Sequence, residues 1–588
     1  MARHRNIKNS FITVIPSPLF TLFRVSPLTS LLNKTPRSDR SCSSFPPRSS
    51  LFMIFLLILV SFLGLSLLRL VFVSQNLVPC PCPLTSFPTL LPPPNSHLSL
   101  ASLSTKNQEP VVLSRSATVP LPAHAVSRNM TKEEAEFWAQ PDGEGYRPCL
   151  DFSILYRKAS AKISKEKHRF LVVVVSGGLN QQKNQIVDAV VIARILEAAL
   201  VVPVLEINQI WKDESEFSDI FDVDHFKRTL QADVRVVSSL PSTHLSSKPT
   251  INTRMPLNVS PLWIRTKFLT ELNKEGVLIL KGIDSKLSKN LPLDLQKLRC
   301  KVAFHALRFA APIQELGDRF ARRMWIEGPY IALHLRLEKD VWVRTGCLTG
   351  LGPEYDDIIR KIRESRPRLL TGRLNMTYTQ RRLAGLCPLN ALEVARFSDS
   401  ASWEISLLEC DLGHYLISFY CRLLKALGAP RTARVYRAGG EPFGGAKALQ
   451  ALVGEFPNVV TKEMLAREGE LSPYVNRPSA MAALDYIVSL SSDVFLPSHG
   501  GNMGRAMQGH RAYVGHRKFV KPDKREMIPF FGDASISEAE FRSIMRKLHS
   551  RYQGQPEKRT NKRSTRDVIA YPVPECMCRH SNRPLLRS

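Results

Sequence analysis

Short apolar runs alternate with longer amphipathic stretches from residue 170 onward. In a first series these segments are 170–175, 184–200, 200–205, 276–280, 298–324 and 330–337. A second series comprises 433–438, 445–455, 459–462, 481–489 and 494–496. Strands that alternate with helices are typical of parallel sheets covered by helices. The pattern therefore predicts an α/β fold with two successive halves, 146–340 and 341–550, and a cleft between them.

Residues 396–421 interrupt the helical spacing of the second half. The periodicity of 389–395 resumes at 422–428, and Gly428 followed by Pro430 predicts a helix end. We interpret 396–421 as an insertion, for example a retained intron in the gene sequence. The alternative is a genuine surface loop with a short helix, and sequencing the transcript across this region distinguishes the two.

The longest apolar run is Leu51–Val73, interrupted by Ser61, Gly64, Ser66 and a late Arg69. At ~1.5 Å per residue, a helix of this length crosses a ~30 Å hydrocarbon core. A cleaved signal peptide is the alternative, but its apolar region is usually ~7–15 residues long and lies nearer the start. The run therefore predicts one transmembrane signal anchor over 51–73.

Basic residues crowd before this anchor, and none follows Arg69 until Lys106. By the positive-inside rule, this asymmetry predicts a cytoplasmic tail over 1–50 and a lumenal remainder, which is a single-pass type II topology. Residues 74–145 are rich in proline and serine, and their proline run at 92–94 excludes a regular helix. We expect this segment to form a stem or linker.

The formal net charge of +29 is unevenly placed, because the first fifty residues and the tail 551–588 are strongly basic. Charge runs are usually solvated segments, and both ends are predicted to be such arms. The chain has no zinc-finger spacing, no RNA-binding strand motif and no heptad-backed basic helix. We therefore expect no nucleic-acid partner despite the high pI.

Three N-glycosylation sequons follow the anchor, at Asn129, Asn258 and Asn375. The same part of the chain contains cysteines at positions 149, 300, 347, 387, 576 and 578. An oxidising lumen favours disulfides between such cysteines, although their pairing cannot be derived from the sequence. Cys576 and Cys578 are too close together for a zinc-type CxxC pair.

A glycine-rich turn follows the first apolar strand: Val172-Val-Val-Val-Ser-Gly-Gly-Leu-Asn-Gln-Gln-Lys183. A strand that ends in glycines and opens a helix directs backbone N–H groups and a positive dipole end to one point, which suits a phosphate. Close packing of a strand–helix turn explains the glycines equally well. The third glycine of the dinucleotide fingerprint is absent, which disfavours NAD.

Further motifs follow later strands. They are His334-Leu-Arg-Leu-Glu-Lys-Asp340, Glu441-Pro-Phe-Gly-Gly445, Ser492-Asp-Val-Phe-Leu-Pro-Ser-His-Gly-Gly-Asn-Met-Gly504 and Gly509-His-Arg511. Together with the GGLNQ turn, these blocks resemble the motifs of the plant GDP-fucose O-fucosyltransferase family, from about residue 172 to 518. The resemblance implies a GT-B-like fold of two Rossmann-like halves, in the Golgi membrane with the catalytic part in the lumen.

The resemblance also implies that Arg336 grips the sugar diphosphate. A fixed guanidinium stabilises the negative charge that develops on a leaving phosphate. The candidate catalytic residues are Arg336 and the nearest motif carboxylates, Glu338 and Asp340. The candidate substrate-binding residues come from all the motifs: Gly177, Gly178, Leu179, Asn180, His334, Leu335, Arg336, Asp493, Ser498, Gly501, Asn502 and Met503. For His334 the alternative is a hydrogen-bonded histidine at a strand end.

Two positions depart from the family pattern. Some relatives outside plants carry a glutamate, a candidate base, where this chain has Gly177, so the catalytic base is left unassigned. Lys183 stands where an arginine is usual, and a lysine cannot bind a phosphate bidentately.

Asp222-Val-Asp224 forms a D-x-D triplet, a pattern that many glycosyltransferases use to hold a divalent metal ion. Short carboxylates also bond local backbone amides readily. In families of this two-domain type, arginine and helix ends supply the positive charge. We therefore interpret Asp222 and Asp224 as turn or cap residues, and we expect no metal ligands and no cofactor.

The implied activity is transfer of fucose from GDP-fucose to a hydroxyl of a protein or glycan acceptor, with inversion and without a metal. One alternative is a UDP-rhamnose-dependent pectin rhamnosyltransferase, because an acidic acceptor suits the basic lumenal part. The other is a non-catalytic lumenal protein that binds a glycan or a nucleotide sugar.

Overall fold

The computed structural model describes residues 130–163, 168–208, 211–244, 251–253, 255–349, 351–366, 376–388, 418–498, 500–531, 535–551, 553–558 and 567–579. Within these ranges, no helix combines the length and hydropathy needed to cross a bilayer. Several predicted features lie outside the described residues: the tail 1–50, the anchor 51–73, the stem up to 129, Asn129, Asn375, the insertion up to 417 and the tail from 580.

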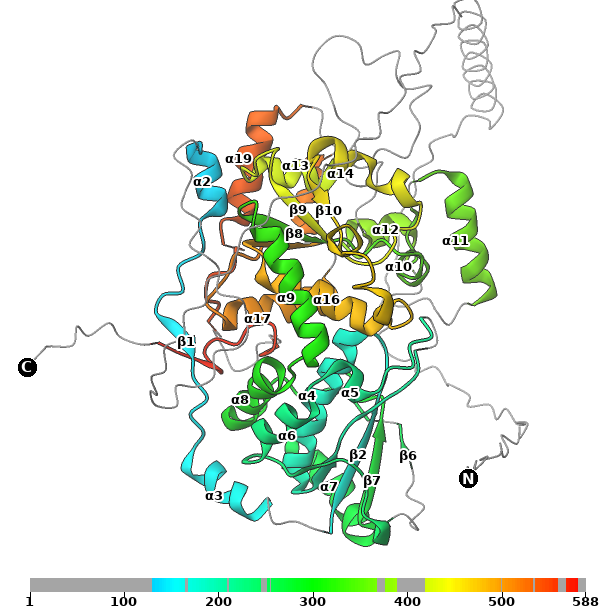
Figure 1. Cartoon of the computed structure of the whole chain (residues 1–588), viewed down its shortest axis with the longest axis vertical. Helices are drawn as coiled ribbons and strands as arrows, with labels where there is room; N and C mark the ends of the chain where they lie inside the picture. The colour runs from blue at the N-terminus through cyan, green and yellow to red at the C-terminus, as the bar shows by residue number, and fades with distance from the viewer. Residues whose placement is uncertain are drawn as a thin grey trace, which may run out of the picture. The chain divides into compact units, whose positions relative to one another are not determined.

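The first sheet contains only parallel strands, in the order β5-β3-β2-β7-β6 with β4 also paired to β2. Its strands are β2 (Phe170–Val175), β3 (Ala199–Val201), β4 (Val204–Leu205), β5 (Val236–Val237), β6 (Ile251–Asn252) and β7 (Val277–Lys281). Helices α4 (Leu179–Leu196) and α7 (Pro261–Glu275) pack against it. Figure 1 shows this sheet in the lower part of the view.

The second sheet is also parallel, in the order β10-β9-β8-β11. Its strands are β8 (Tyr330–His334), β9 (Arg434–Ala438), β10 (Val459–Val460) and β11 (Val494–Pro497). The predicted α/β fold with parallel sheets is thus confirmed. The predicted boundary after residue 340 differs from the sheets, however, because β8 hydrogen-bonds to β9 and β11 and not to the first sheet.

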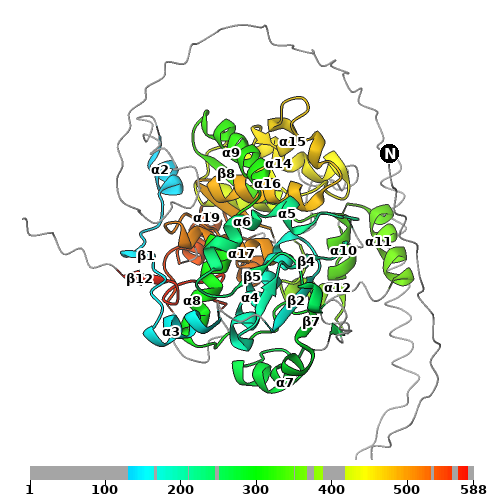
Figure 2. The same ribbon diagram turned by 60° about the horizontal axis from the view of Figure 1, so that its bottom comes forward.

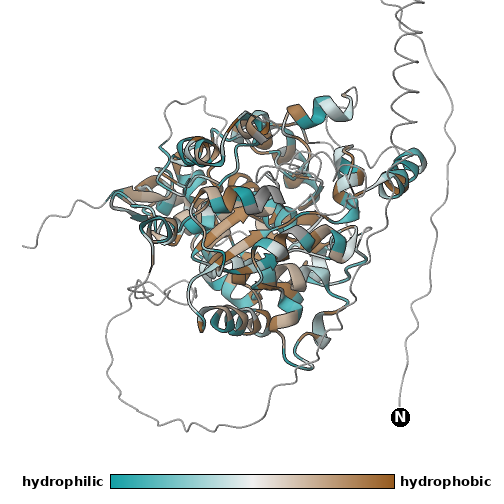
Figure 3. Cartoon of the chain, turned by 90° about the horizontal axis from the view of Figure 1, so that it is seen from above, coloured by the Kyte–Doolittle hydropathy of each residue, from teal (hydrophilic) through white to brown (hydrophobic). Residues whose placement is uncertain are grey.

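Alternate residues of β8 face two hydrophobic clusters, with Tyr330 and Ala332 in one and Ile331 and Leu333 in the other. The first cluster also contains Val173 of β2, so the two sheets share one core. Helices α9 (Ala311–Trp325), α16 (Pro478–Ser491) and α17 (Asn502–Tyr513) form this junction, and α16 and α17 contact α4. Apolar colouring gathers on the central strands in Figure 3.

The remaining helices complete the two halves. They are α2 (Lys132–Trp138), α3 (Ile154–Ile163), α5 (Phe217–Ile220), α6 (Val223–Leu230), α8 (Leu293–Lys301), α10 (Lys339–Thr345), α11 (Pro353–Ser365), α12 (Tyr378–Leu383), α13 (Ser418–Ala426), α14 (Gln450–Glu455), α15 (Lys462–Leu465), α18 (Lys524–Phe531) and α19 (Glu538–His549). Helix α2 lies within the predicted stem but packs Phe137 into the second cluster. The folded part therefore begins before residue 145.

The C-terminal segment 567–579 corrects the prediction of a solvated arm. Its apolar residues Val568, Ile569 and Val573 are buried in the shared core. Strand β12 (Met577–Arg579) pairs antiparallel with β1 (Tyr146–Pro148), as Figure 2 shows. The prediction failed because a few apolar residues within a basic stretch are enough to pack against the core.

Three disulfides join six of the cysteines in the described ranges: Cys149–Cys578, Cys300–Cys576 and Cys347–Cys387. Two of them fasten the C-terminal segment, one to the residue after β1 and one to α8. Gly509 of α17 lies directly against this segment, because a Cβ there would be 1.4 Å from the carbonyl oxygen of Ile569. The segment therefore contacts both halves.

Candidate active site

The carboxyl end of β8 places His334 and Arg336 beside the end of β11. The backbone N–H of Arg336 donates a hydrogen bond of 2.9 Å to Oγ of Ser498. In turn, the backbone N–H of Ser498 donates to the carbonyl of His334 at 2.8 Å. These bonds join the His334–Asp340 motif to the Ser492–Gly504 motif at the sheet edge where open α/β folds usually bind ligands.

Two carboxylates hold the guanidinium of Arg336. Its Nη1 lies 2.7 Å from Oε2 of Glu338, and its Nη2 lies 2.9 Å from Oδ2 of Asp340. The side chain is still 24% exposed, and a guanidinium carries five N–H donors. Arg336 therefore retains donors for a ligand while its acidic neighbours fix its orientation.

Burial changes the protonation of the groups around Arg336. It lowers the pKa of His334 to about 4, so this imidazole is neutral at physiological pH. It raises the pKa of Asp340 despite the nearby charge of Arg336. Burial also acts to raise the pKa of Glu338, but Arg336 and a hydrogen bond from the Gly440 N–H hold the net pKa below its ordinary value.

Several polar atoms of the motif residues are buried without a hydrogen-bond partner among the described residues. They include Nδ1 of His334, Oδ1 of Asp340 and Oδ1 of Asn180. An unpaired buried polar atom costs ~1–3 kcal/mol, so native proteins rarely leave one without a purpose. A polar ligand or ordered water would satisfy these atoms.

The glycine turn between β2 and α4 has a specific backbone requirement. Gly177 has φ +89°, and a Cβ there would lie 2.4 Å from Oε1 of Gln181. The same Oε1 accepts a hydrogen bond of 3.2 Å from the N–H of Gly178 at the start of α4. The side chain of Leu179 is buried in the core, so it offers a ligand only its backbone.

Helix α17 supplies a second helix start. Gly501 precedes Asn502 at its N-terminus and provides no side-chain cap. The first N–H groups of a helix have no intrahelical partner and carry the positive end of its dipole. Met503 packs against the shared core, whereas Arg505 is exposed in the first turn.

Trp211 joins the glycine turn to Arg336 and was missed by the sequence motifs. Its ring centroid lies 5.5 Å from Cζ of Arg336. A Cβ on Gly178 would lie only 3.1 Å from Cζ3 of the same ring. The only signal in the sequence is a tryptophan shortly after a predicted strand, and nothing in its spacing relates it to a motif.

Asp284 was also missed and links the two helix starts. It follows β7, accepts a hydrogen bond from the side chain of Gln181 and lies in the field of Arg505. Burial raises the pKa of this carboxyl, and its hydrogen bonds and the charge of Arg505 only partly offset that shift.

Two predicted substrate contacts lie elsewhere. Oδ2 of Asp493 accepts a hydrogen bond of 2.9 Å from the N–H of Tyr330, at the opposite edge of the sheet from Ser498. Five residues of extended chain span ~16 Å, which separates Asp493 from the site. The side chain of Leu335 is buried in the second cluster, so it cannot contact a substrate directly.

The side chain of Lys183 lies against two aromatic rings and not beside the glycine turn. Only 6% exposed, it places Nζ 3.9 Å from the ring centroid of Tyr486 and 5.3 Å from that of Phe309. Burial lowers its pKa to about 7. A phosphate contact by Lys183 is therefore not supported.

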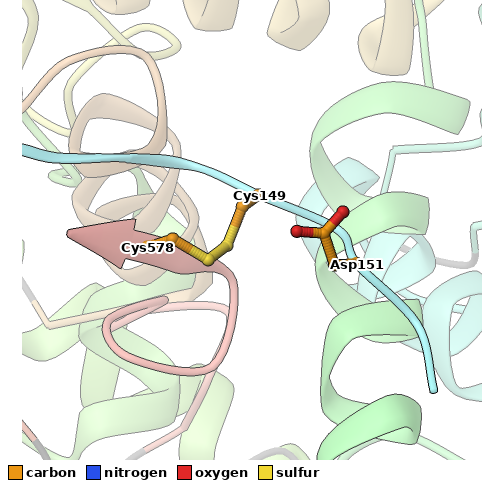
Figure 4. A group of neighbouring side chains, drawn as sticks. All are labelled: Cys149, Asp151 and Cys578. Atoms are coloured by element: carbon orange, nitrogen blue, oxygen red, sulfur yellow. A yellow bond between two sulfur atoms is a disulfide. The ribbon is translucent and has the colours of Figure 1, made fainter. Parts of the chain in front are cut away.

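The D-x-D triplet has the local role that we predicted. Oδ1 of Asp222 accepts a hydrogen bond of 2.9 Å from the N–H of His225 and caps α6, with Asp224 in the first turn. Among the described residues, one group of three side chains has metal-ligand spacing: Cys149, Asp151 and Cys578 (Figure 4). Its two sulfurs form a disulfide, so no thiolate is available there.

Comparisons with known proteins agree on one family. A family model described as GDP-fucose protein O-fucosyltransferase matches residues 170–405 and 414–514. Residues 406–413, between these ranges, lie inside the predicted insertion. The chain is 67% identical over 466 residues to O-fucosyltransferase 37 of Arabidopsis thaliana, covering 79% of this chain and 78% of that protein.

One further relative and one solved structure are similar to this chain over different shares of its length. O-fucosyltransferase 20 of Arabidopsis thaliana is 50% identical over 582 residues, which is 97% of this chain and 95% of that protein. A crystal structure of POFUT1 in complex with GDP-fucose is 14% identical, with a TM-score of 0.36, over 61% of this chain and 99% of that one.

Proposed function

The chain belongs to the GDP-fucose protein O-fucosyltransferase family and is a glycosyltransferase, and from this premise we propose that it transfers fucose from GDP-fucose to a hydroxyl of a protein or glycan acceptor. The observation that carries this proposal is the convergence at one sheet edge of Arg336, Ser498 and the start of α17. Trp211 connects Arg336 to the glycine turn at the start of α4.

Breaking the bond between the sugar and the diphosphate leaves negative charge on the outer phosphate. The remaining N–H donors of Arg336 and the positive ends of α4 and α17 stabilise such charge, and they do so before the reaction begins. Because the attacking hydroxyl enters from the other face of the sugar, transfer proceeds with inversion.

Glu338 and Asp340 orient Arg336 in this mechanism. Both carboxylates already pair with its guanidinium, at 2.7 and 2.9 Å. A carboxylate in such a pair is a poor proton acceptor. An oxocarbenium-like transition state needs chiefly leaving-group stabilisation, so the acceptor proton is lost late and a weak base suffices.

The proposal includes no metal and no cofactor. Arg336 and two helix starts provide positive potential at the diphosphate, and Asp222 is occupied as a helix cap. Hydrogen-bond donors of Arg336 and of the two helix starts would then stabilise the leaving group in place of a divalent ion.

We further propose a single-pass type II protein of the Golgi membrane with its catalytic part in the lumen. The apolar segment 51–73 and its basic flank support the anchor. The three disulfides suit an oxidising compartment. Asn258 lies exposed in a turn, where a glycan can be attached.

The direct test uses the purified full-length protein with GDP-fucose or UDP-rhamnose. A ligand at ~100 times its Kd stabilises the folded state by ~2.7 kcal/mol, which raises Tm measurably. We expect GDP-fucose and GDP to raise Tm and UDP-rhamnose to leave it unchanged. Protection by UDP-rhamnose alone would replace the proposed donor and favour the rhamnosyltransferase.

A further inference from the structure

Trp211 touches two parts of the proposed donor site that come from different sheets. Its ring lies against Gly178, where a Cβ would be 3.1 Å from Cζ3, and its centroid is 5.5 Å from Cζ of Arg336. A guanidinium within about 6 Å of an indole ring is attracted to the negative charge of the ring face. Trp211 is half-buried, so part of the residue remains accessible to solvent or to a ligand.

Hydrogen bonds hold the chain on both sides of Trp211. The backbone N–H of Trp211 donates to Oδ1 of Asn208 at 3.1 Å, close to the end of β4. On the other side, the carboxylate of Asp213 accepts hydrogen bonds from the N–H groups of Ser215 at 3.0 Å and Ser479 at 2.6 Å. Ser479 belongs to the first turn of α16, beneath the second sheet.

The residues that form the hydrogen bonds of Asp213 are buried, and its carboxylate keeps its negative charge. Asp213, Ser215 and Ser479 are all buried. Burial acts to raise the pKa of Asp213, but the hydrogen bonds from Ser215 and Ser479 outweigh it and lower the net pKa. These bonds hold the backbone on both sides of Trp211, and its ring lies beside both the glycine turn and Arg336.

We propose that Trp211 is a positioning residue that sets the orientation of the Arg336 guanidinium relative to the Gly177–Asn180 turn. This inference rests on the proposed function, because it assigns Arg336 to the leaving diphosphate. Glu338 and Asp340 contact the guanidinium from the same segment of chain as Arg336. The indole contacts it from the other half of the protein. The donor diphosphate then meets a guanidinium whose plane is already fixed, beside the first N–H groups of α4.

The test compares Trp211→Ala and Trp211→Phe with a matched variant, Trp263→Ala. Trp263 lies on α7, is also half-buried and stacks edge-on to Phe268 instead of a motif residue. We expect Trp211→Ala to lower kcat about tenfold, as the loss of one partly desolvated cation–π contact does, with little change in Tm. Trp211→Phe restores most of the rate, and Trp263→Ala leaves kcat unchanged.

A double substitution separates positioning from a general packing effect. In an Arg336→Lys background, removal of the indole should cost less than in the parent, because the contact no longer serves a planar guanidinium. A full additional tenfold loss in that background would overturn the inference. Parental kcat in Trp211→Ala, or a lowered Tm with kcat per folded molecule unchanged, would also overturn it.

Intrinsic fluorescence supplies a readout that does not depend on turnover. If Trp211 borders the donor, GDP should change the tryptophan emission of the parent and of Trp263→Phe but not that of Trp211→Phe. An unchanged GDP response in Trp211→Phe would contradict the assignment. Failure of the proposed function would look different: the parent itself would neither bind GDP nor turn over GDP-fucose.

Discussion

Arg336 lies between two carboxylates. Its replacement by lysine tests whether the planar guanidinium is needed or only a positive charge. Arg336→Lys retains the charge but loses the planar pair of donors. We expect turnover to fall by ~10²–10³, the usual cost of removing a preorganised donor from a developing oxyanion, with Tm unchanged. Turnover and Tm are to be measured on the same preparation.

Arg360→Lys is the matched control, because that arginine forms an exposed ion pair with Asp357 on α11. It should behave as the parent in both measurements. If Arg336→Lys lowers Tm together with turnover, the ion pairs with Glu338 and Asp340 are structural. Turnover within a few-fold of the parent would remove Arg336 from the site.

Lys183 should make the stability depend on pH. Its folded pKa is about 7, whereas an unfolded lysine titrates near ~10.4. Between these values the unfolded state binds more protons, so the free energy of unfolding rises with pH. The contact with Tyr486 favours the charged form and reduces the effect, but burial dominates.

We therefore expect the unfolding free energy of the parent, relative to Lys183→Met, to increase by up to ~1.4 kcal/mol per pH unit from pH 7 to 9. Urea titrations at several pH values measure this difference. Lys274→Met, at an exposed position on α7, should show no such trend. A flat difference for Lys183 would mean that its pKa is not lowered.

Single residues differed in how well the sequence predicted them. The cap role of Asp222 followed from the short-range chemistry of aspartate and is confirmed. Asp493 was assigned to the site although it precedes its strand, and ligands in parallel sheets lie at the other end. Trp211 could not be predicted, because its partners come from two distant segments.

At the scale of elements, the contact between α17 and the C-terminal segment permits a sharp test. A Cβ on Gly509 would lie 1.4 Å from the carbonyl oxygen of Ile569, which is backbone and cannot rotate away. Gly509→Ala should therefore lower the free energy of unfolding by about 3 kcal/mol or more, as severe overpacking does. Chemical denaturation measures the change.

Gly454→Ala is the control for helix propensity. Gly454 lies in α14, and a Cβ there meets nothing within 4 Å. This substitution should be neutral or stabilise by up to ~1 kcal/mol. Equal stability of the two variants would show that α17 and the C-terminal segment do not pack as described.

Long buried elements were the most predictable. The predicted strand 170–175 coincides with β2, and 433–438 overlaps β9 within one residue. The two-residue strands β5 and β6 escaped prediction because they are too short to form an apolar run. The helix predicted from residue 184 begins at Leu179, because Gln181 caps the glycine turn.

At the scale of the whole molecule, we propose that an arginine and helix ends stabilise the leaving diphosphate. The dependence of transfer on a divalent metal ion tests this. Transfer from GDP-fucose should be unchanged in EDTA, because no step requires a divalent ion. Loss of activity in EDTA, with recovery on adding manganese, would contradict this and would bring Asp224 back as a candidate ligand. The parental Tm in EDTA is the control for unfolding.

The way the halves join was the least predictable feature. Local patterns predicted two α/β halves, but the shared core depends on contacts such as those of α16 with both α9 and α4. These contacts link residues more than a hundred positions apart, and one sequence alone does not contain that information. For the same reason, β8 was placed in the wrong half.

The clasp formed by Cys149–Cys578 and Cys300–Cys576 also determines an order of events during synthesis. These bonds join residues separated by 429 and 276 positions, so neither bond can form until the C-terminal segment has been synthesised. Domains usually fold from the N-terminus as the ribosome proceeds at ~5–20 residues per second. Cys149 and Cys300 are therefore synthesised well before these two bonds can form. A chain truncated before Cys576 would leave Cys149 and Cys300 without their native partners, so that their thiols could form disulfides with other cysteines.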